Sequence, residues 1–153
     1  MVIHIALFRP EIPQNTGNIS RLCVGLGVPL HIIGTPSFDL SEKAVRRAGL
    51  DYWSHLQLHQ HNDWESFEKF FPNQNRIFLV TKYGKTIYSK TNFQSGDCLV
   101  FGQETKGLPD EIKSRYQEDR KLFIPMKTEM RSINLSNSVA IVAYEATKQI
   151  ENW

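Results

Sequence analysis

The chain has 153 residues but only two cysteines, and it lacks any long apolar run. Cys23 and Cys98 each lie inside an apolar stretch and form no Cys-x-x-Cys pair, so two buried free thiols in a reducing compartment are expected. A catalytic thiol is disfavoured, because it needs an exposed, electropositive setting. No run approaches the ~18 apolar residues of a membrane span, and residues 1–8 are too short for a signal peptide. We therefore expect a cytoplasmic protein with no membrane partner.

Several nucleotide-binding and hydrolase motifs are also missing. There is no G-x-G-x-x-G dinucleotide fingerprint and no G-x-S-x-G elbow, which argues against a serine hydrolase. Residues 102–109 have the G-x-x-x-x-G frame of a phosphate loop, but Leu108 and Pro109 stand where that motif needs Lys and Ser or Thr. Gly102 is then either part of a tight turn between a strand and a helix, or a place where backbone approaches a flat ligand closely.

Net charge and histidine content constrain the function less than these missing motifs do. The net charge is +2, and the basic excess lies after residue 75, which is compatible with RNA as a partner but also with an ordinary solvated surface. Lys43, Arg46 and Arg47 form a basic helix edge that is either solvated or a phosphate contact. His55, His59 and His61 are close in sequence, but no carboxylate or cysteine completes a metal site, so we predict a surface histidine cluster.

Apolar runs and capping signals predict an α/β fold in which a parallel sheet has helices on both faces, as a single domain over residues 1–153. Asp39 and Glu42 have the spacing of a capping box. The predicted strands cover residues 2–8, 30–33, 56–59, 76–81, 98–101 and 121–124. The predicted helices cover residues 19–26, 42–48, 63–71, 109–117 and 136–150. Residues 9–18 and 82–96 are predicted to be loops.

A serine- and asparagine-rich stretch at residues 130–137 precedes the last helix. Asn134 or Ser136 would cap that helix, so the stretch is either a well-capped core helix or a polar ligand-binding loop at a helix N-terminus. The helix is apolar on two sides, with Val139 and Val142 on one and Ile141 and Tyr144 on the other. A helix of this kind must be covered by its own domain and by something else.

Three loops follow strand ends, where ligands bind in sheets of this kind, and together they resemble a known family. Residues 13–21, 101–109 and 124–137 are similar, in order and spacing, to the three signature motifs of the SPOUT superfamily of RNA 2′-O-methyltransferases. The sequence looks most like the small bacterial members that methylate the wobble cytidine or uridine of tRNA. The resemblance spans almost the whole chain.

The resemblance implies a deep C-terminal trefoil knot, an obligate homodimer, S-adenosylmethionine as methyl donor, no metal, and the tRNA anticodon stem-loop as partner. It assigns catalytic roles to Arg21, Asn15, Glu104 and Asn134. It assigns the cofactor pocket to Val80, Gly102, Ile124 and Ser132.

Chemistry leaves the role of Arg21 open. The family mechanism makes this arginine the base that accepts the ribose proton, yet an arginine in a protein keeps its own proton. Arg21 would instead position a phosphate and stabilise the alkoxide. A non-catalytic nucleotide- or RNA-binding regulator on the same fold is the alternative function. The presence of Arg21, Glu104 and Asn134 speaks against it.

Overall fold

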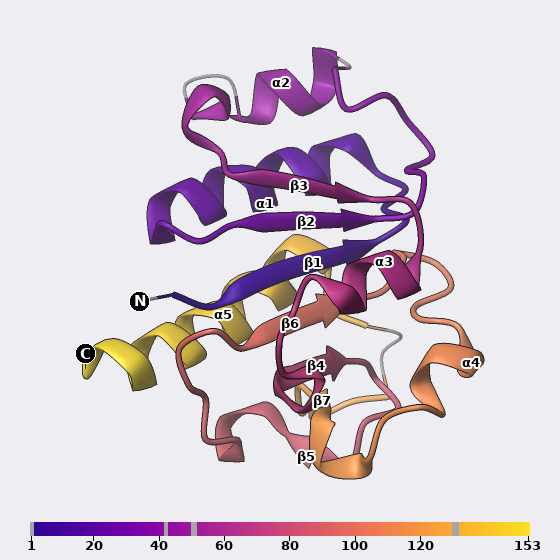
Figure 1. The fold of residues 1–153 in the computed structure, drawn as a ribbon, viewed down its shortest axis with the longest axis vertical. Helices are drawn as coiled ribbons and strands as arrows, with labels where there is room; N and C mark the ends of the chain where they lie inside the picture. Colours follow the sequence, from indigo (N-terminus) through magenta and orange to yellow (C-terminus); the bar gives the residue numbers. More distant parts are fainter. Residues whose placement is uncertain (1, 42, 50–51, 130–131) are drawn as a thin grey trace.

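The computed structural model describes residues 2–41, 43–49, 52–129 and 132–153. Its centre is a seven-stranded sheet with the order β3-β2-β1-β6-β4-β7-β5, in which every neighbouring pair is parallel (Figure 1). The strands are β1 His4–Phe8, β2 Leu30–Ile33, β3 Leu58–His61, β4 Ile77–Val80, β5 Thr86–Ile87, β6 Cys98–Phe101 and β7 Lys121–Phe123. The predicted α/β class and parallel sheet are confirmed.

Five α-helices are seen in the described residues. They are α1 Pro13–Leu26, α2 Lys43–Gly49, α3 Trp64–Lys69, α4 Asp110–Lys113 and α5 Leu135–Glu151. Short 3-10 turns lie at Trp53–His55, Gln74–Arg76, Tyr88–Lys90 and Glu118–Arg120. Asn134 is the N-cap of α5, one of the two predicted caps. Asp39 accepts a hydrogen bond from the Ser41 amide at 2.8 Å, while Glu42, the other half of the predicted capping box, lies outside the described residues.

Several predictions of element bounds were wrong. Strand β3 begins at Leu58 and ends at His61, two residues later than predicted. The predicted loop over residues 9–18 is helical from Pro13 onward, because proline is compatible with the first helical position. The predicted loop over residues 82–96 contains β5, which is two residues long and too short to show a periodic pattern. Helix α4 ends at Lys113 rather than near Gln117.

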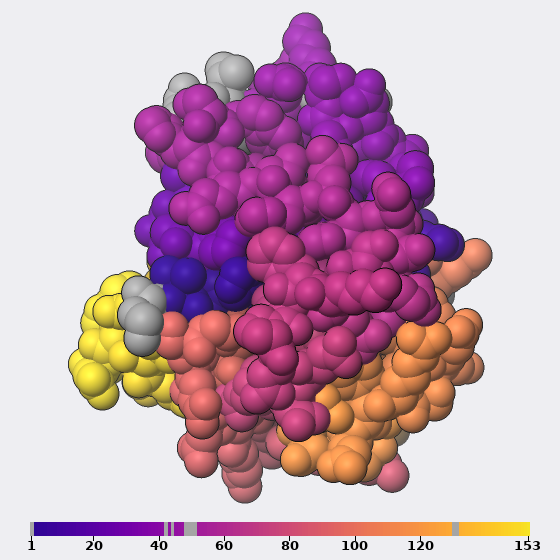
Figure 2. All heavy atoms as spheres, in the orientation of Figure 1, coloured from indigo at the N-terminus to yellow at the C-terminus, as the bar shows by residue number. Residues whose placement is uncertain are grey.

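The sheet is covered on both faces, as predicted (Figure 1). Alternate residues of each strand face opposite sides, so Ile5 and Leu7 of β1 pack into a core with α1 and α5. Ala6 and Phe8 pack into a second core with α3 and α4. The space-filling view shows that the segments around α3 and α4 hide most of the strands on that side (Figure 2).

Each core holds one of the two thiols. Cys23 lies in the core under α1, Cys98 lies in the other, and both are free and fully buried, as predicted. Burial raises the pKa of the Cys23 thiol to about 12 and that of Cys98 well above its usual value, so both stay protonated near neutral pH. In the described part of the chain, none of the helices is long and apolar enough to cross a membrane.

The histidines form a cluster that is mostly covered, so the predicted surface position is wrong for two of the three. Only His55 is exposed; His59 and His61 are half-buried beside the fully buried His31. The His31 ring stacks on His59 with centroids 4.8 Å apart, and its Nδ1 lies 2.9 Å from Nε2 of His61. His4 Nδ1 lies 2.9 Å from Nε2 of His31. Aromatic rings of α3 and the residues after it cover this group, which explains its burial.

Candidate functional site

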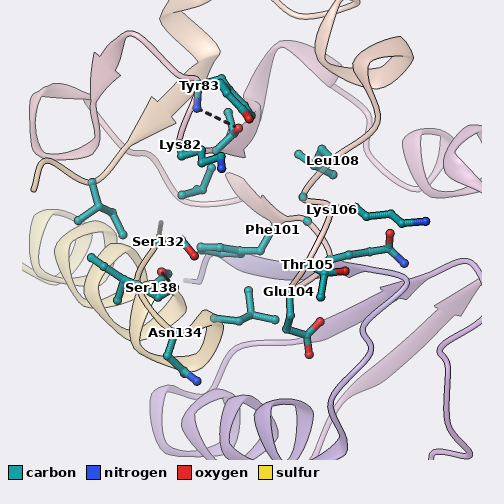
Figure 3. A pocket seen from close by; sticks show the side chains of 18 of the residues that line it. Lys82, Tyr83, Phe101, Glu104, Thr105, Lys106, Leu108, Ser132, Asn134 and Ser138 are labelled. Carbon is teal, nitrogen blue, oxygen red and sulfur yellow. Dashed lines mark hydrogen bonds between the residues drawn. The ribbon is translucent and has the colours of Figure 1, made fainter. Parts of the chain in front are cut away.

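A cavity of about 350 Å³ opens at the carboxyl edge of the sheet. It lies where β4, β6 and β7 end, beside the N-terminus of α5 (Figure 3). A volume of this order is typical of pockets for small molecules and cofactors. It is therefore the candidate functional site among the described residues.

The four predicted cofactor residues all line this cavity. Val80 ends β4, Gly102 follows β6, Ile124 follows β7, and Ser132 precedes α5. Three segments distant in sequence thus form one wall each. The apolar part of the lining also includes Phe101 and Leu108 from the second motif.

Gly102 makes a tight turn, one of the two roles that the sequence left open. A Cβ at this position would lie 2.3 Å from the carbonyl carbon of Gly107, so no other residue fits without moving backbone. The Gln103 and Gly107 amides each donate to the other residue's carbonyl, at 3.1 and 3.0 Å, and close the loop onto itself. The glycine therefore makes a tight turn, and this turn is also a wall of the cavity.

Glu104 binds the start of α1. Its Oε1 accepts a hydrogen bond from the Glu11 amide at 2.9 Å, and its Oε2 accepts one from the Ile12 amide at 2.7 Å. The side chain of Asn15 donates to the same Oε2 at 3.3 Å. Ile12 is the N-cap residue of α1 and cannot cap with its own side chain, so the carboxylate of Glu104 satisfies free donors at the positive end of the helix.

Asn15 also bonds to Asn134, the N-cap residue of α5. Its Oδ1 accepts a hydrogen bond from Nδ2 of Asn134 at 3.2 Å. Oδ1 of Asn134 in turn accepts from the Ser136 amide at 2.9 Å and the Asn137 amide at 3.3 Å, which caps α5. Glu104, Asn15 and Asn134, which we call the loop network, therefore join all three motifs and line one cavity, as the resemblance implied.

Arg21 does not line the cavity of its own chain. It follows Asn15 by six residues on α1, a spacing that places the two side chains on different sides of the helix. It is exposed, and its guanidinium lies 5.2 Å from the centre of the Tyr52 ring. The structure thus brings together three of the four predicted catalytic residues. Arg131 of the third motif lies outside the described residues.

Sequence reasoning missed a further wall of the cavity. Thr81, Lys82 and Tyr83 follow β4 directly and line it, together with Lys113 of α4. Lys82 and Tyr83 begin the segment 82–96, which was predicted to be a loop. Their position directly after the carboxyl end of a buried parallel strand could have indicated that they line a ligand site. As to metals, no group of three or more histidine, cysteine or acidic side chains in the described residues could hold an ion.

Comparison with known proteins agrees with this geometry. The model of the SpoU rRNA methylase family matches residues 2–144. A tRNA (cytidine(34)-2′-O)-methyltransferase of Escherichia coli strain K12 is 44% identical over 97% of this chain and 94% of its own length. One from Burkholderia cenocepacia is 42% identical over 97% and 96%.

Solved structures share the fold. One described as giving structural insights into the 2-OH methylation of C/U34 on tRNA has a TM-score of 0.94 and 40% identity, covering 99% of this chain and 98% of that one. The SpoU methyltransferase AviRb from Streptomyces viridochromogenes, in complex with AdoMet, has a TM-score of 0.84 and 23% identity, covering 97% of this chain and 57% of that one. The resemblance found in the three motifs is confirmed, and the chain belongs to the SpoU rRNA methylase family.

Proposed function

We propose that this chain transfers a methyl group from S-adenosylmethionine to the ribose 2′-oxygen of the wobble nucleotide, cytidine or uridine, of tRNA. The observation that carries the proposal is the cavity at the carboxyl edge, whose three motif loops are joined by the loop network. The 44% identity to the Escherichia coli tRNA (cytidine(34)-2′-O)-methyltransferase over nearly the full length supports the choice of substrate.

The lining of the cavity fits the methyl donor. Val80, Phe101 and Ile124 offer apolar surface to a flat base, and the tight turn at Gly102 brings backbone groups close to it. Ser132 adds a hydroxyl at the start of the third motif. When bound, S-adenosylmethionine supplies an electrophilic methyl on a sulfonium; the protein must place the ribose oxygen in line with it.

The loop network positions groups and does not provide a base. The carboxylate of Glu104 already accepts three hydrogen bonds, so its oxygens are occupied by the start of α1 and by Asn15. Asn134 is exposed at the mouth of the cavity, where its amide can meet the ribose. A ribose hydroxyl is a poor nucleophile at neutral pH, so its oxyanion must be stabilised as the proton leaves.

Arg21 is the group proposed for that stabilisation, through the cavity of a partner subunit. It lies outside the cavity of its own chain, while α5 has an uncovered apolar side. Val139, Val142 and Ala143 are buried, but Tyr144 and Trp153 are 49% and 67% exposed. A second copy would cover this side in a symmetric homodimer.

The remaining expectations belong to the same proposal. Residues 1–153 act as one domain, the chain after β6 forms the deep trefoil knot of the superfamily, and no metal takes part. The two buried free thiols support a reducing, cytoplasmic location.

The decisive assay combines purified protein, methyl-labelled S-adenosylmethionine and unmodified tRNA. We expect label in tRNA, at the 2′-oxygen of nucleotide 34 once the RNA is digested. A tRNA carrying a 2′-deoxy nucleotide at that position is the matched control and should take up no label. Cofactor binding without any transfer would favour the non-catalytic regulator instead.

Replacing Arg21 tests its role in catalysis. Arg21→Ala should abolish methyl transfer, with a loss of about 1,000-fold, because a charged donor at the developing oxyanion is removed. The affinity for S-adenosylmethionine, measured by calorimetry, should stay nearly unchanged. Equal loss of both would contradict the assigned role.

A mixing experiment tests whether Arg21 acts across the dimer. Subunits with Arg21→Ala and subunits with Asn134→Asp should each, alone, lose about 100-fold or more of the methyl transfer. Mixed dimers should regain activity, since one cavity then has an intact Asn134 and receives an intact Arg21 from its partner. Absence of regain in mixed dimers, isolated with two different affinity tags, would place Arg21 in the site of its own chain.

A further inference from the structure

An exposed aromatic ring stands beside the cavity with lysines around it. Tyr83 is 65% exposed, which is unusual for so large a ring. The ammonium groups of Lys82 and Lys113 lie 5.1 and 4.4 Å from its centre (Figure 3 labels Lys82 and Tyr83). These cation–π contacts place two positive charges against the ring, which keeps most of its surface exposed.

A second, more open hollow adjoins this ring. It is lined by Tyr83, three lysines and one acidic residue, Asp110. The lysines are Lys106 from the second motif, Lys113 from α4 and Lys121 from the start of β7. We call this second hollow, with Tyr83 and the three lysines in its lining, the lysine hollow. It shares Thr81, Tyr83, Lys106, Leu108 and Lys113 with the cavity, so the two form one continuous surface.

The acidic neighbours do not remove the positive charge of the lysine hollow. Lys113 pairs with Asp110 at 3.1 Å and Lys121 pairs with Glu118 at 2.9 Å. The lysine side chains are only 16% and 15% exposed, whereas Asp110 and Glu118 are 100% and 53% exposed. The carboxylates lie on the solvent side of each pair, where a phosphate can replace them. Lys106 is itself exposed at the tip of the second-motif loop.

We propose that the lysine hollow binds single-stranded RNA next to the nucleotide that is methylated. A base from a neighbouring nucleotide stacks on Tyr83, and the backbone phosphates beside it lie against the lysines. Unpaired bases stacked on aromatic side chains, with basic residues along the backbone, are how proteins hold single-stranded RNA. The inference rests on the proposed function, because it takes the substrate of the cavity to be an RNA loop.

The test measures RNA binding and cofactor binding separately, on the full chain. A fluorescently labelled tRNA anticodon stem-loop is titrated with protein at several salt concentrations, and S-adenosylmethionine affinity is measured by calorimetry without RNA. Tyr83→Ala should weaken RNA binding about tenfold through loss of stacking, whereas Tyr83→Phe should bind like the wild type. Lys106→Ala should weaken binding and lower the slope of log affinity against log salt by about 0.7. Lys69→Ala, on the exposed side of α3, is the control and should change neither.

The outcomes separate this inference from the proposed function. Wild-type protein that methylates tRNA, with Tyr83→Ala and Lys106→Ala binding RNA as tightly as wild type, would overturn the RNA surface alone. Loss of S-adenosylmethionine affinity in these variants, with RNA binding intact, would also overturn it and assign the lysine hollow to the cofactor. Wild-type protein that neither binds nor methylates RNA would overturn both.

Discussion

Two polar clusters in this molecule have opposite relations to solvent. The loop network of Glu104, Asn15 and Asn134 lies at the carboxyl edge and lines an open cavity. The histidine cluster around His31 lies on the face of the sheet, covered by aromatic rings. Both use hydrogen bonds between side chains far apart in sequence. The first lines a cavity and the second is packed among aromatic rings, so polar clustering alone does not identify a functional site.

The two clusters also differ in how they meet the cost of burying polar groups. Asn15 and Glu104 satisfy each other and the free amides at the start of α1. His31 is bonded on both ring nitrogens to other histidines, and burial together with these neighbouring rings lowers its pKa and keeps it neutral. The loop network should therefore respond to mutation through activity, and the histidine cluster through acid stability.

Among changes to these two clusters, the largest effect is expected from Asn134→Asp. Aspartate caps a helix as well as asparagine, so the free energy of unfolding should change by less than about 0.5 kcal/mol. The amide that donates to Asn15 is lost, and methyl transfer should fall about 100-fold because the ribose is misplaced. Single-turnover methylation and urea denaturation measure the two quantities. A stability loss that matches the activity loss would make Asn134 a structural residue, like those of the histidine cluster.

An intermediate effect is expected from acid on the histidine cluster. Burial, reinforced by His4, His59 and His61, lowers the pKa of His31 to about 2. The unfolded chain binds a proton at this residue below about pH 6.5, but the folded chain does not, so acid favours unfolding. The free energy of unfolding should fall by about 1.4 kcal/mol for each pH unit below 6.5.

Burial also lowers the pKa values of His4 and His61. The free energy of unfolding of the wild type should therefore fall more steeply with acid than His31 alone predicts. Urea denaturation at pH 7, 6 and 5 measures it. His31→Leu should have a shallower slope, whatever its stability at pH 7. His55→Gln changes the exposed histidine and serves as the control. An unchanged slope in His31→Leu would show that the cluster is not the source of acid sensitivity.

The smallest effect is expected at the rim of the loop network. Oε1 of Glu11 accepts hydrogen bonds from the Thr105 amide at 3.1 Å and the Thr105 hydroxyl at 2.8 Å. These bonds lower the pKa of Glu11. Glu11→Gln keeps an acceptor and loses only the charge, so kcat/KM should fall less than about threefold. A fall in methyl transfer close to that of Asn134→Asp would show that Glu11 belongs to the loop network.

The sequence predicts the bounds of those elements whose residues carry a continuous apolar pattern. Strands β2 and β6 match their predicted bounds, because each is a short, wholly buried run. The start of α1 was missed because Asn15, Thr16 and Gly17 are buried there without an apolar pattern. The carboxylate that stabilises this start comes from Glu104, 89 residues after Asn15. A contact of that range leaves no local signal.

The candidate site could likewise be predicted only where its residues lie in recognisable motifs or at strand ends. Seven of the eight predicted residues line one cavity, since six belong to motifs that follow strand ends and Val80 is itself the last residue of β4. Arg21 does not, because it lies six residues after Asn15 on α1, on a different side of the helix. Lys82 and Tyr83 were missed because β4 was expected to end in an unpatterned loop.

The strand order has a consequence for how the chain folds during synthesis. β6 lies between β1 and β4, so the amino-terminal strands leave the ribosome before residues 98–101 can join them. Until then β1 and β4 each present an unpaired edge that another chain could bind. Pairing across such long sequence distances is slow, and the cavity is complete only when residues 132–138 have been made. We therefore expect folding to begin with the sheet's amino-terminal half and to end with the cavity.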